Sequence, residues 1–140
     1  MGCDIHVYLE HRDEHGEFHQ IEVNDPLSAR IYTRFAFLAG VRNRANIMPL
    51  SSPRGLPFDV SDDIHAESDG WRADGHTHSW FLIEELLNFD YDQPLIFREG
   101  GRDSECTETT YRELLDDAFL PELRELQTQG VDRLIFWFDN

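Results

Sequence analysis

The chain has 140 residues, of which 40% are hydrophobic and 12% aromatic, and this composition predicts one globular domain and excludes a disordered chain. No apolar run approaches the roughly 20 residues that a membrane span needs, and the N-terminus has no basic stretch followed by an apolar one. We therefore expect a cytoplasmic protein without a membrane segment or a secretory signal.

The net charge is −16, and all twelve basic residues are arginines. Direct binding to nucleic acid is not expected, because such binding depends on cations that neutralise phosphates. Three explanations of the acidity remain open: a proteome of acidic composition, an acidic face that binds a basic partner, and carboxylates that collect metal ions. The two cysteines, Cys3 and Cys106, do not predict a disulfide in a cytoplasmic protein.

The first half of the chain begins with a predicted hairpin. Residues 1–10 alternate between an apolar and a polar face, and residues 17–23 alternate again after a polar turn. Helical spacing follows over 28–39, with Ser28 as the expected N-cap and Gly40 at the end. Residues 41–66 show little periodicity, and the prolines among them predict a long loop, which is uncommon in a small domain unless it has a function.

The second half alternates between predicted helices and strands. Ser79 is the expected N-cap of a helix that ends at 88, and a short strand is predicted at 91–97. Residues 110–129 are helical in pattern, with a break at Pro121, and residues 133–140 form an apolar strand. The expected fold is α+β: a single domain over 1–140, with a mainly antiparallel sheet, helices packed on one side and a long Pro-rich loop.

Two pairs of polar residues suggest a metal site. Asp4 and His6 lie on one face of the first strand, and His76 and His78 lie in a predicted loop. Imidazoles with a carboxylate suit a divalent ion such as zinc or manganese, and Asp139 at the end of the last strand could assist. The alternatives are a carboxylate–imidazole pair with a structural hydrogen bond and a histidine loop that caps a helix.

Arginines in the long loop suggest a second kind of site. Arg42 and Asn43 follow the first helix, and Arg54 lies among the prolines. Arginine suits bidentate recognition of phosphate, so these residues are candidates for contacts with a substrate. The alternative is that the arginines pair with carboxylates of the surface.

Several stretches resemble a family of small uncharacterised proteins from bacteriophage and prophage genomes, whose members begin Met-Gly-Cys-Asp-Ile-His. The similar stretches are 1–6, 37–43, 54–57, 74–80 and 136–140. The resemblance covers nearly the whole chain. It implies a phage setting, with the cytoplasm of the host cell as the place of action, rather than a mechanism.

Two functions follow as hypotheses. The first is a metal-dependent hydrolase of a phosphoester or nucleotide-like substrate, with Asp4, His6 and Asp139 as catalytic residues and Asp4, His6, His76 and His78 as metal ligands. The second is a non-catalytic inhibitor of host defence, which either sequesters a small nucleotide or covers a basic host protein surface.

Overall fold

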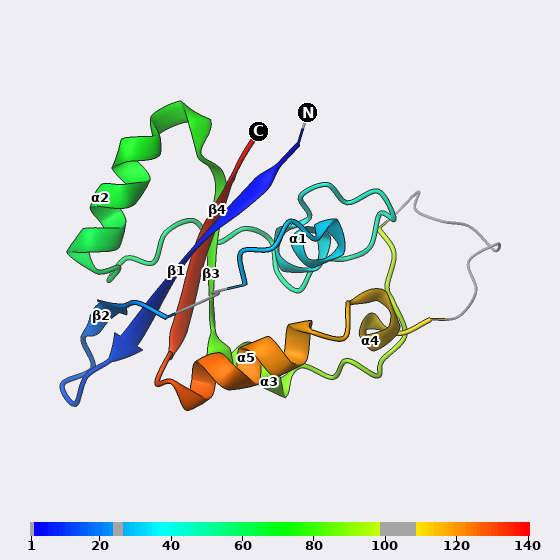
Figure 1. Ribbon diagram of the computed structural model, residues 1–140. Coiled ribbons are helices and arrows are strands. Elements are labelled where there is room, and N and C mark those ends of the chain that lie inside the picture. Colours follow the sequence, from blue (N-terminus) through cyan, green and yellow to red (C-terminus); the bar gives the residue numbers. More distant parts are fainter. Residues whose placement is uncertain (1, 24–26, 99–108) are drawn as a thin grey trace.

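A four-stranded antiparallel sheet forms the centre of the protein, as seen in a computed structural model that describes residues 2–23, 27–98 and 109–140 (Figure 1). The strand order is β2-β1-β4-β3. The strands are β1 (Asp4–Arg12), β2 (Phe18–Ile21), β3 (His76–Leu82) and β4 (Arg133–Asp139). This arrangement confirms the α+β fold and the hairpin at the start of the chain.

The first and last strands lie side by side in the middle of the sheet. They pair along their whole shared length, from Asp4 opposite Asp139 to Glu10 opposite Arg133. The start of β1 and the end of β4 therefore lie at the same end of the sheet, as Figure 1 shows. The polar residues at the start of β1 and at the end of β4 are neighbours for this reason.

Helices cover both faces of the sheet. The elements on one face are α1 (Tyr32–Ala39), α3 (Ile83–Asn88), α4 (Tyr111–Leu114) and α5 (Phe119–Thr128). On the other face lies α2 (Asp62–Trp71), followed by a 3₁₀ turn, η1 (Arg72–Asp74). The prediction that helices pack on one side is therefore wrong for α2, whose single fully buried residue, Ile64, gives too weak an apolar pattern to reveal the helix.

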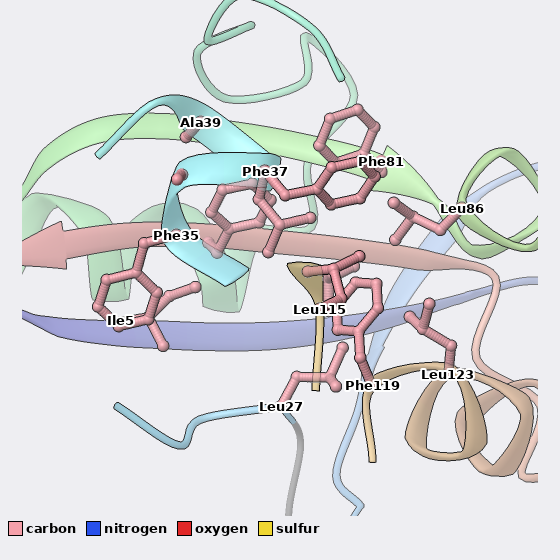
Figure 2. Close-up of a cluster of buried hydrophobic side chains, with 14 of the residues drawn as sticks. Ile5, Leu27, Phe35, Phe37, Ala39, Phe81, Leu86, Leu115, Phe119 and Leu123 are labelled. Atoms are coloured by element: carbon pink, nitrogen blue, oxygen red, sulfur yellow. The ribbon is translucent and has the colours of Figure 1, made fainter. Parts of the chain in front are cut away.

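The two faces have cores of very different size. The major core contains most of the buried side chains, including Phe35 and Phe37 of α1 and Phe119 of α5, packed against the apolar side of the sheet (Figure 2). The minor core, beneath α2, has Ile64, Ile135 and Trp137 as its only buried members among the described residues. The sheet thus separates a large apolar layer from a thinner and more polar one.

The helix predicted from Ser79 is wrong, and so is the loop assigned to His76 and His78. Residues 76–82 form β3, and α3 begins only at Ile83. Ser79 is buried, and its Oγ accepts the Arg54 backbone N–H at 3.0 Å instead of capping a helix. Residues 76–79 are all polar and residues 80–82 are all apolar, so β3 lacks the period-two alternation by which a strand is recognised in a sequence.

Two other boundaries differ from the prediction. The first helix begins at Tyr32 rather than at Ser28, although Gly40 ends it in the left-handed conformation as expected. The strand expected at 91–97 is reduced to two isolated bridges, Ile47 with Phe97 and Pro94 with Thr110. Pro121 lies in the first turn of α5, where a missing N–H costs nothing, so the break between α4 and α5 comes before it.

Among the described residues, no helix has both the length and the apolar character that crossing a membrane requires.

Candidate functional site

The paired ends of β1 and β4 bring His6 and Asp139 together. His6 Nε2 lies 2.9 Å from Asp139 Oδ2, and the side chains are 25% and 26% exposed. The two residues are 133 positions apart in sequence, and the antiparallel pairing of β1 with β4 is what joins them. Both are therefore accessible to a small molecule while their contact is partly shielded from water.

The carboxylate determines the chemistry of the imidazole. A carboxylate is an acceptor, so the Nε2 atom of His6 must carry the proton that it donates to Asp139. In neutral His6 the lone pair is then on Nδ1, for which no hydrogen bond occurs among the described residues. The Trp71 ring, 4.2 Å from the His6 ring between centroids, packs against the imidazole. The arrangement is an oriented base of the kind that hydrolases use.

Histidines of β3 lie on the other side of the last strand. His76 Nε2 is 2.6 Å from Asn140 Oδ1, and its Nδ1 is 2.9 Å from Thr77 Oγ1. His78 stacks on Trp137, with 5.2 Å between ring centroids, and its Nε2 lies 3.1 Å from Ser68 Oγ. Burial lowers the pKa of His78, and the charge of His76 lowers it further, which favours the neutral form of this imidazole.

Between these histidines the backbone is strained. Thr77 has a φ of 56°, in the left-handed region, where a β-branched residue is a rare outlier. The strain coincides with an irregularity in the pairing of β3 with β4 between His76 and Ser79. Backbone conformations of this cost concentrate at functional sites, where the surrounding structure maintains them.

Cations gather at the same end of the sheet. Arg30 Nε donates to Asp4 Oδ1 at 2.8 Å, and this hydrogen bond is the main reason why the pKa of Asp4 is lowered. Arg42 and Arg44 lie over the Tyr32 ring, at 5.5 and 5.9 Å from its centroid. Tyr32 in turn accepts the Cys3 backbone N–H through its hydroxyl oxygen at 3.1 Å, which fixes this group beside the start of β1.

Burial raises the pKa of the Cys3 thiol, although the hydrogen bond and the charge of Arg42 oppose this rise. This contact places the Arg42 guanidinium beside Cys3, the residue that precedes β1. Arg30 and Arg42 therefore both lie near the start of β1.

The predicted metal ligands are not gathered as a set. Among the described residues, the one group of three potential ligand atoms within 4.8 Å of one another is Asp13, Glu17 and His19, in the β1–β2 turn. The Nε2 atoms of His6, His76 and His78 instead lie against oxygens of Asp139, Asn140 and Ser68. The donor types suit zinc or manganese, but the site as it is arranged does not fit the ion.

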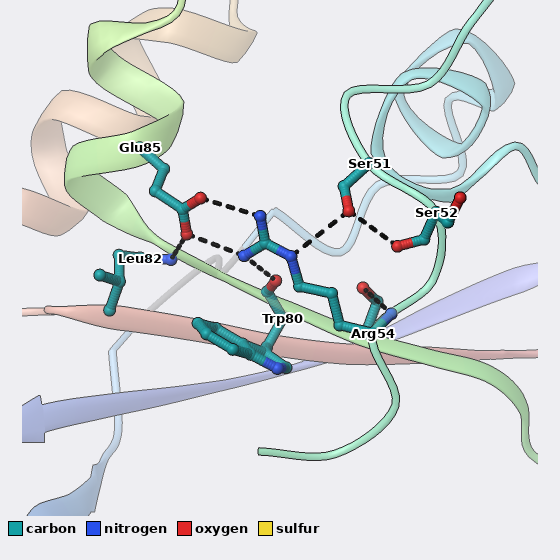
Figure 3. A network of polar contacts seen from close by, with 7 residues as sticks. Ser51, Ser52, Arg54, Trp80, Leu82 and Glu85 are labelled. Carbon is teal, nitrogen blue, oxygen red and sulfur yellow. Dashed lines mark hydrogen bonds and ion pairs between the residues drawn. The ribbon is translucent and has the colours of Figure 1, made fainter.

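Two predicted phosphate contacts have structural roles. Both side-chain polar atoms of Asn43 bond the Ile47 backbone, at 2.7 and 3.0 Å. Arg54 makes a bidentate pair with Glu85, at 2.8 and 2.9 Å, and donates to the Trp80 carbonyl oxygen at 3.1 Å (Figure 3). These bonds tie the Pro-rich loop to β3 and α3.

Sequence reasoning missed three members of the site: Arg30, Trp71 and Asn140. Arg30 and Trp71 belong to no motif, Asn140 closes the similar stretch 136–140 but was not a candidate, and each reaches the site only through tertiary structure. A further feature is the Trp137 indole N–H, which is buried and has no acceptor among the described residues. Such an orphaned donor is rare in native proteins, and a bound acceptor or a water molecule is its usual explanation.

Searches against protein-family models, curated proteins and solved structures give no match. The geometry of the strand ends is therefore the basis for assigning a function.

Proposed function

We propose that the protein hydrolyses a small phosphoester or nucleotide-like anion at the paired ends of β1 and β4. The observation that carries this proposal is the contact of 2.9 Å between His6 Nε2 and Asp139 Oδ2, which leaves Nδ1 as the basic atom. The reaction would take place in the cytoplasm of a host cell, as the resemblance to phage proteins implies.

In this proposal His6 acts as the general base. Its Nδ1 takes a proton from the attacking water, and Asp139 stabilises the imidazolium that forms. The water oxygen forms the new bond to phosphorus, and the ester oxygen leaves with the electrons of the bond that breaks. Asp139 is a positioning residue, because it acts through His6.

The arginines near the start of β1 supply the positive charge that an anionic substrate needs. In a chain with a net charge of −16, the placement of Arg30, Arg42 and Arg44 beside one polar site is the feature that favours an anion there. Guanidinium groups bind phosphate oxygens bidentately and stabilise the charge that builds up on them during transfer. Arg30 is already paired with Asp4, so Arg42 is the first candidate for a contact with phosphate.

The test is hydrolysis of bis(p-nitrophenyl) phosphate by the purified protein after treatment with a chelator. Changing His6→Ala should lower kcat at least roughly 100-fold, within the range attributed to a positioned base. Asp139→Asn should lower kcat while leaving KM nearly unchanged, and it should shift the pH profile of kcat, which a purely structural carboxylate would not do.

The matched control is another close histidine–aspartate pair, His19 of β2 with Asp13 at 2.7 Å. His19→Ala should leave kcat unchanged. Equal losses for His6→Ala and His19→Ala would overturn the assignment. Activity that disappears with the chelator and returns with zinc or manganese would overturn this mechanism in favour of the metal-dependent one.

A second candidate, sequestration of a small nucleotide without turnover, is favoured by one observation. Each of the three histidines at the site already has its Nε2 atom against an oxygen partner, an arrangement that suits binding as well as catalysis. Tight binding of a nucleotide by calorimetry, with no product after prolonged incubation, would select this candidate.

A further inference from the structure

A fully exposed aromatic residue lies outside the strand-end site. Phe58 has a relative exposure of 102%, the largest among the exposed apolar side chains of the described residues. It lies in a turn that is closed by a hydrogen bond of 3.2 Å from the Val60 N–H to the Pro57 carbonyl oxygen. An isolated exposed phenylalanine is common, so the support beneath it decides what it means.

The segment that carries Phe58 is fastened to the sheet on both sides. Before it, the Gly55 N–H donates to the His78 carbonyl oxygen at 2.9 Å. After it, Asp59 pairs with Arg133 at 2.7 Å, and the Ser61 N–H donates to the buried Glu10 carboxylate at 2.8 Å. Phe58 is thus presented to solvent by a fixed backbone, so little conformational entropy would be lost on docking.

The neighbouring helix, α2, is acidic in both halves; in its second half Glu67 accepts the Tyr8 hydroxyl at 3.4 Å and Asp69 lies 3.2 Å from His65. Asp62 and Asp63 in its first turn favour the helix dipole. Glu67 and Asp69 lie in the second half, where negative charge opposes the dipole, and the last turn has no basic residue. All residues of α2 except Ile64, Ser68 and Trp71 are exposed.

An open groove of about 790 Å³ runs between α2 and the end of β2. Glu22, Asp63 and Glu67 supply three carboxylates to its lining, Trp71 supplies an aromatic wall, and no basic residue lines it. Carboxylates beside an indole suit a lysine or arginine side chain, which pairs with the former and stacks on the latter.

We propose that Phe58 and this groove form one docking surface for a protein partner that has an apolar pocket flanked by lysine or arginine side chains. Phe58 would be the aromatic anchor, and the groove would receive a basic side chain of the partner. Three and four residues separate Phe58 from the first-turn acids of α2, so the anchor and these charges are close in sequence. Charge complementarity selects a basic partner, because Asp59 follows Phe58 and three carboxylates line the groove.

The test uses a short synthetic peptide of alternating arginine and leucine, labelled with a fluorophore, and measures its affinity by fluorescence anisotropy. The triple variant Glu22→Gln, Asp63→Asn, Glu67→Gln should weaken binding by roughly tenfold, because each exposed ion pair contributes a few-fold. Phe58→Ala should weaken it by several-fold as well, and all the affected residues are exposed, so folding should not change.

The matched control removes three exposed carboxylates elsewhere: Glu14→Gln, Glu84→Gln and Asp117→Asn. Equal weakening in both triple variants would reduce the effect to general charge attraction and overturn the proposal. Amide and indole chemical shifts provide a second readout: perturbations at Ala66, Gly70 and Trp71 support docking in the groove, and shifts spread over all acidic surfaces contradict it.

Discussion

Alternate residues of the same strands build the two faces of the sheet, and the faces differ in what they contain. In β4, Phe136 and Phe138 point into the major core, whereas Trp137 lies beneath α2 and Asp139 pairs with His6. The face of the major core, which α1, α3, α4 and α5 cover, is mostly apolar. The α2 face has few buried apolar side chains but holds His6, His78, the orphaned indole N–H and the acidic groove. The comparison suggests that one face supplies stability while the other is free to carry polar chemistry.

The largest expected effect contrasts the two cores directly. Phe119→Ala should destabilise the protein by about 3–5 kcal/mol, because Phe119 is fully buried beside other aromatic rings. Ile64→Ala should cost about 2 kcal/mol, at the low end for such a change, since the minor core is small and can relax. Urea denaturation measures both values, and equal losses would contradict the division between the faces.

Each face has a buried arginine in an ion pair: Arg133 with Glu10 on the α2 face, and Arg34 on the face of the major core. Arg34 is 2% exposed and binds Asp116 and Glu122, at 2.8 and 2.7 Å, so it joins α1 to α5. Arg34→Ala should cost about 2–4 kcal/mol by leaving the two carboxylates without their partner. Arg30→Ala, at the exposed site, should leave the urea midpoint unchanged.

Two glycines near the α2 face give a paired prediction. A Cβ at Gly75 would lie 3.0 Å from Trp71 Cβ and 3.2 Å from Trp137 Cδ1, so Gly75→Ala should cost about 1–3 kcal/mol by overpacking. A Cβ at Gly70, within α2, would meet nothing within 4 Å. Gly70→Ala should therefore stabilise the protein by up to about 1 kcal/mol, through the better helix propensity of alanine. Thermal unfolding distinguishes the two signs.

The smallest effect is a loss of stability in acid. The hydrogen bond from Arg54 lowers the pKa of Glu85, and that from Arg34 lowers the pKa of Asp116. Since the folded pKa lies below the unfolded one, each pair stabilises the protein above the unfolded pKa and loses this effect as the pH falls through the folded pKa. The melting temperature should therefore decrease below about pH 4, and Glu85→Gln should make this decrease shallower. An unchanged slope would show that the pair contributes nothing.

The sequence predicted those elements whose own residues have a clear hydrophobic pattern or a clear stop signal. The alternation in residues 1–10 and the apolar run at the C-terminus gave β1 and β4, and Gly40 marked the end of α1. They also gave His6 and Asp139 as candidates. The contact between these two residues depends on the register of β1 with β4, which no local pattern contains.

The remaining features are tertiary in origin. The helix α2 has one fully buried residue, so its apolar pattern is almost absent, and its place on the second face could not be predicted. Arg54 pairs with Glu85 because the Pro-rich loop crosses β3, which made a phosphate contact and a structural ion pair indistinguishable in the sequence. Arg30 and Trp71 reach the site from elements that show no functional motif.

The most direct test of the account compares stability with activity in one conservative variant, His6→Gln. Hydrolysis of bis(p-nitrophenyl) phosphate and the melting temperature are measured on the same preparation. The account predicts a melting temperature within a few degrees of the unmodified protein, because His6 is on the polar face, together with a loss of kcat of at least roughly 100-fold. A large decrease in melting temperature with unchanged kcat would contradict it, since the pair of His6 with Asp139 would then be structural.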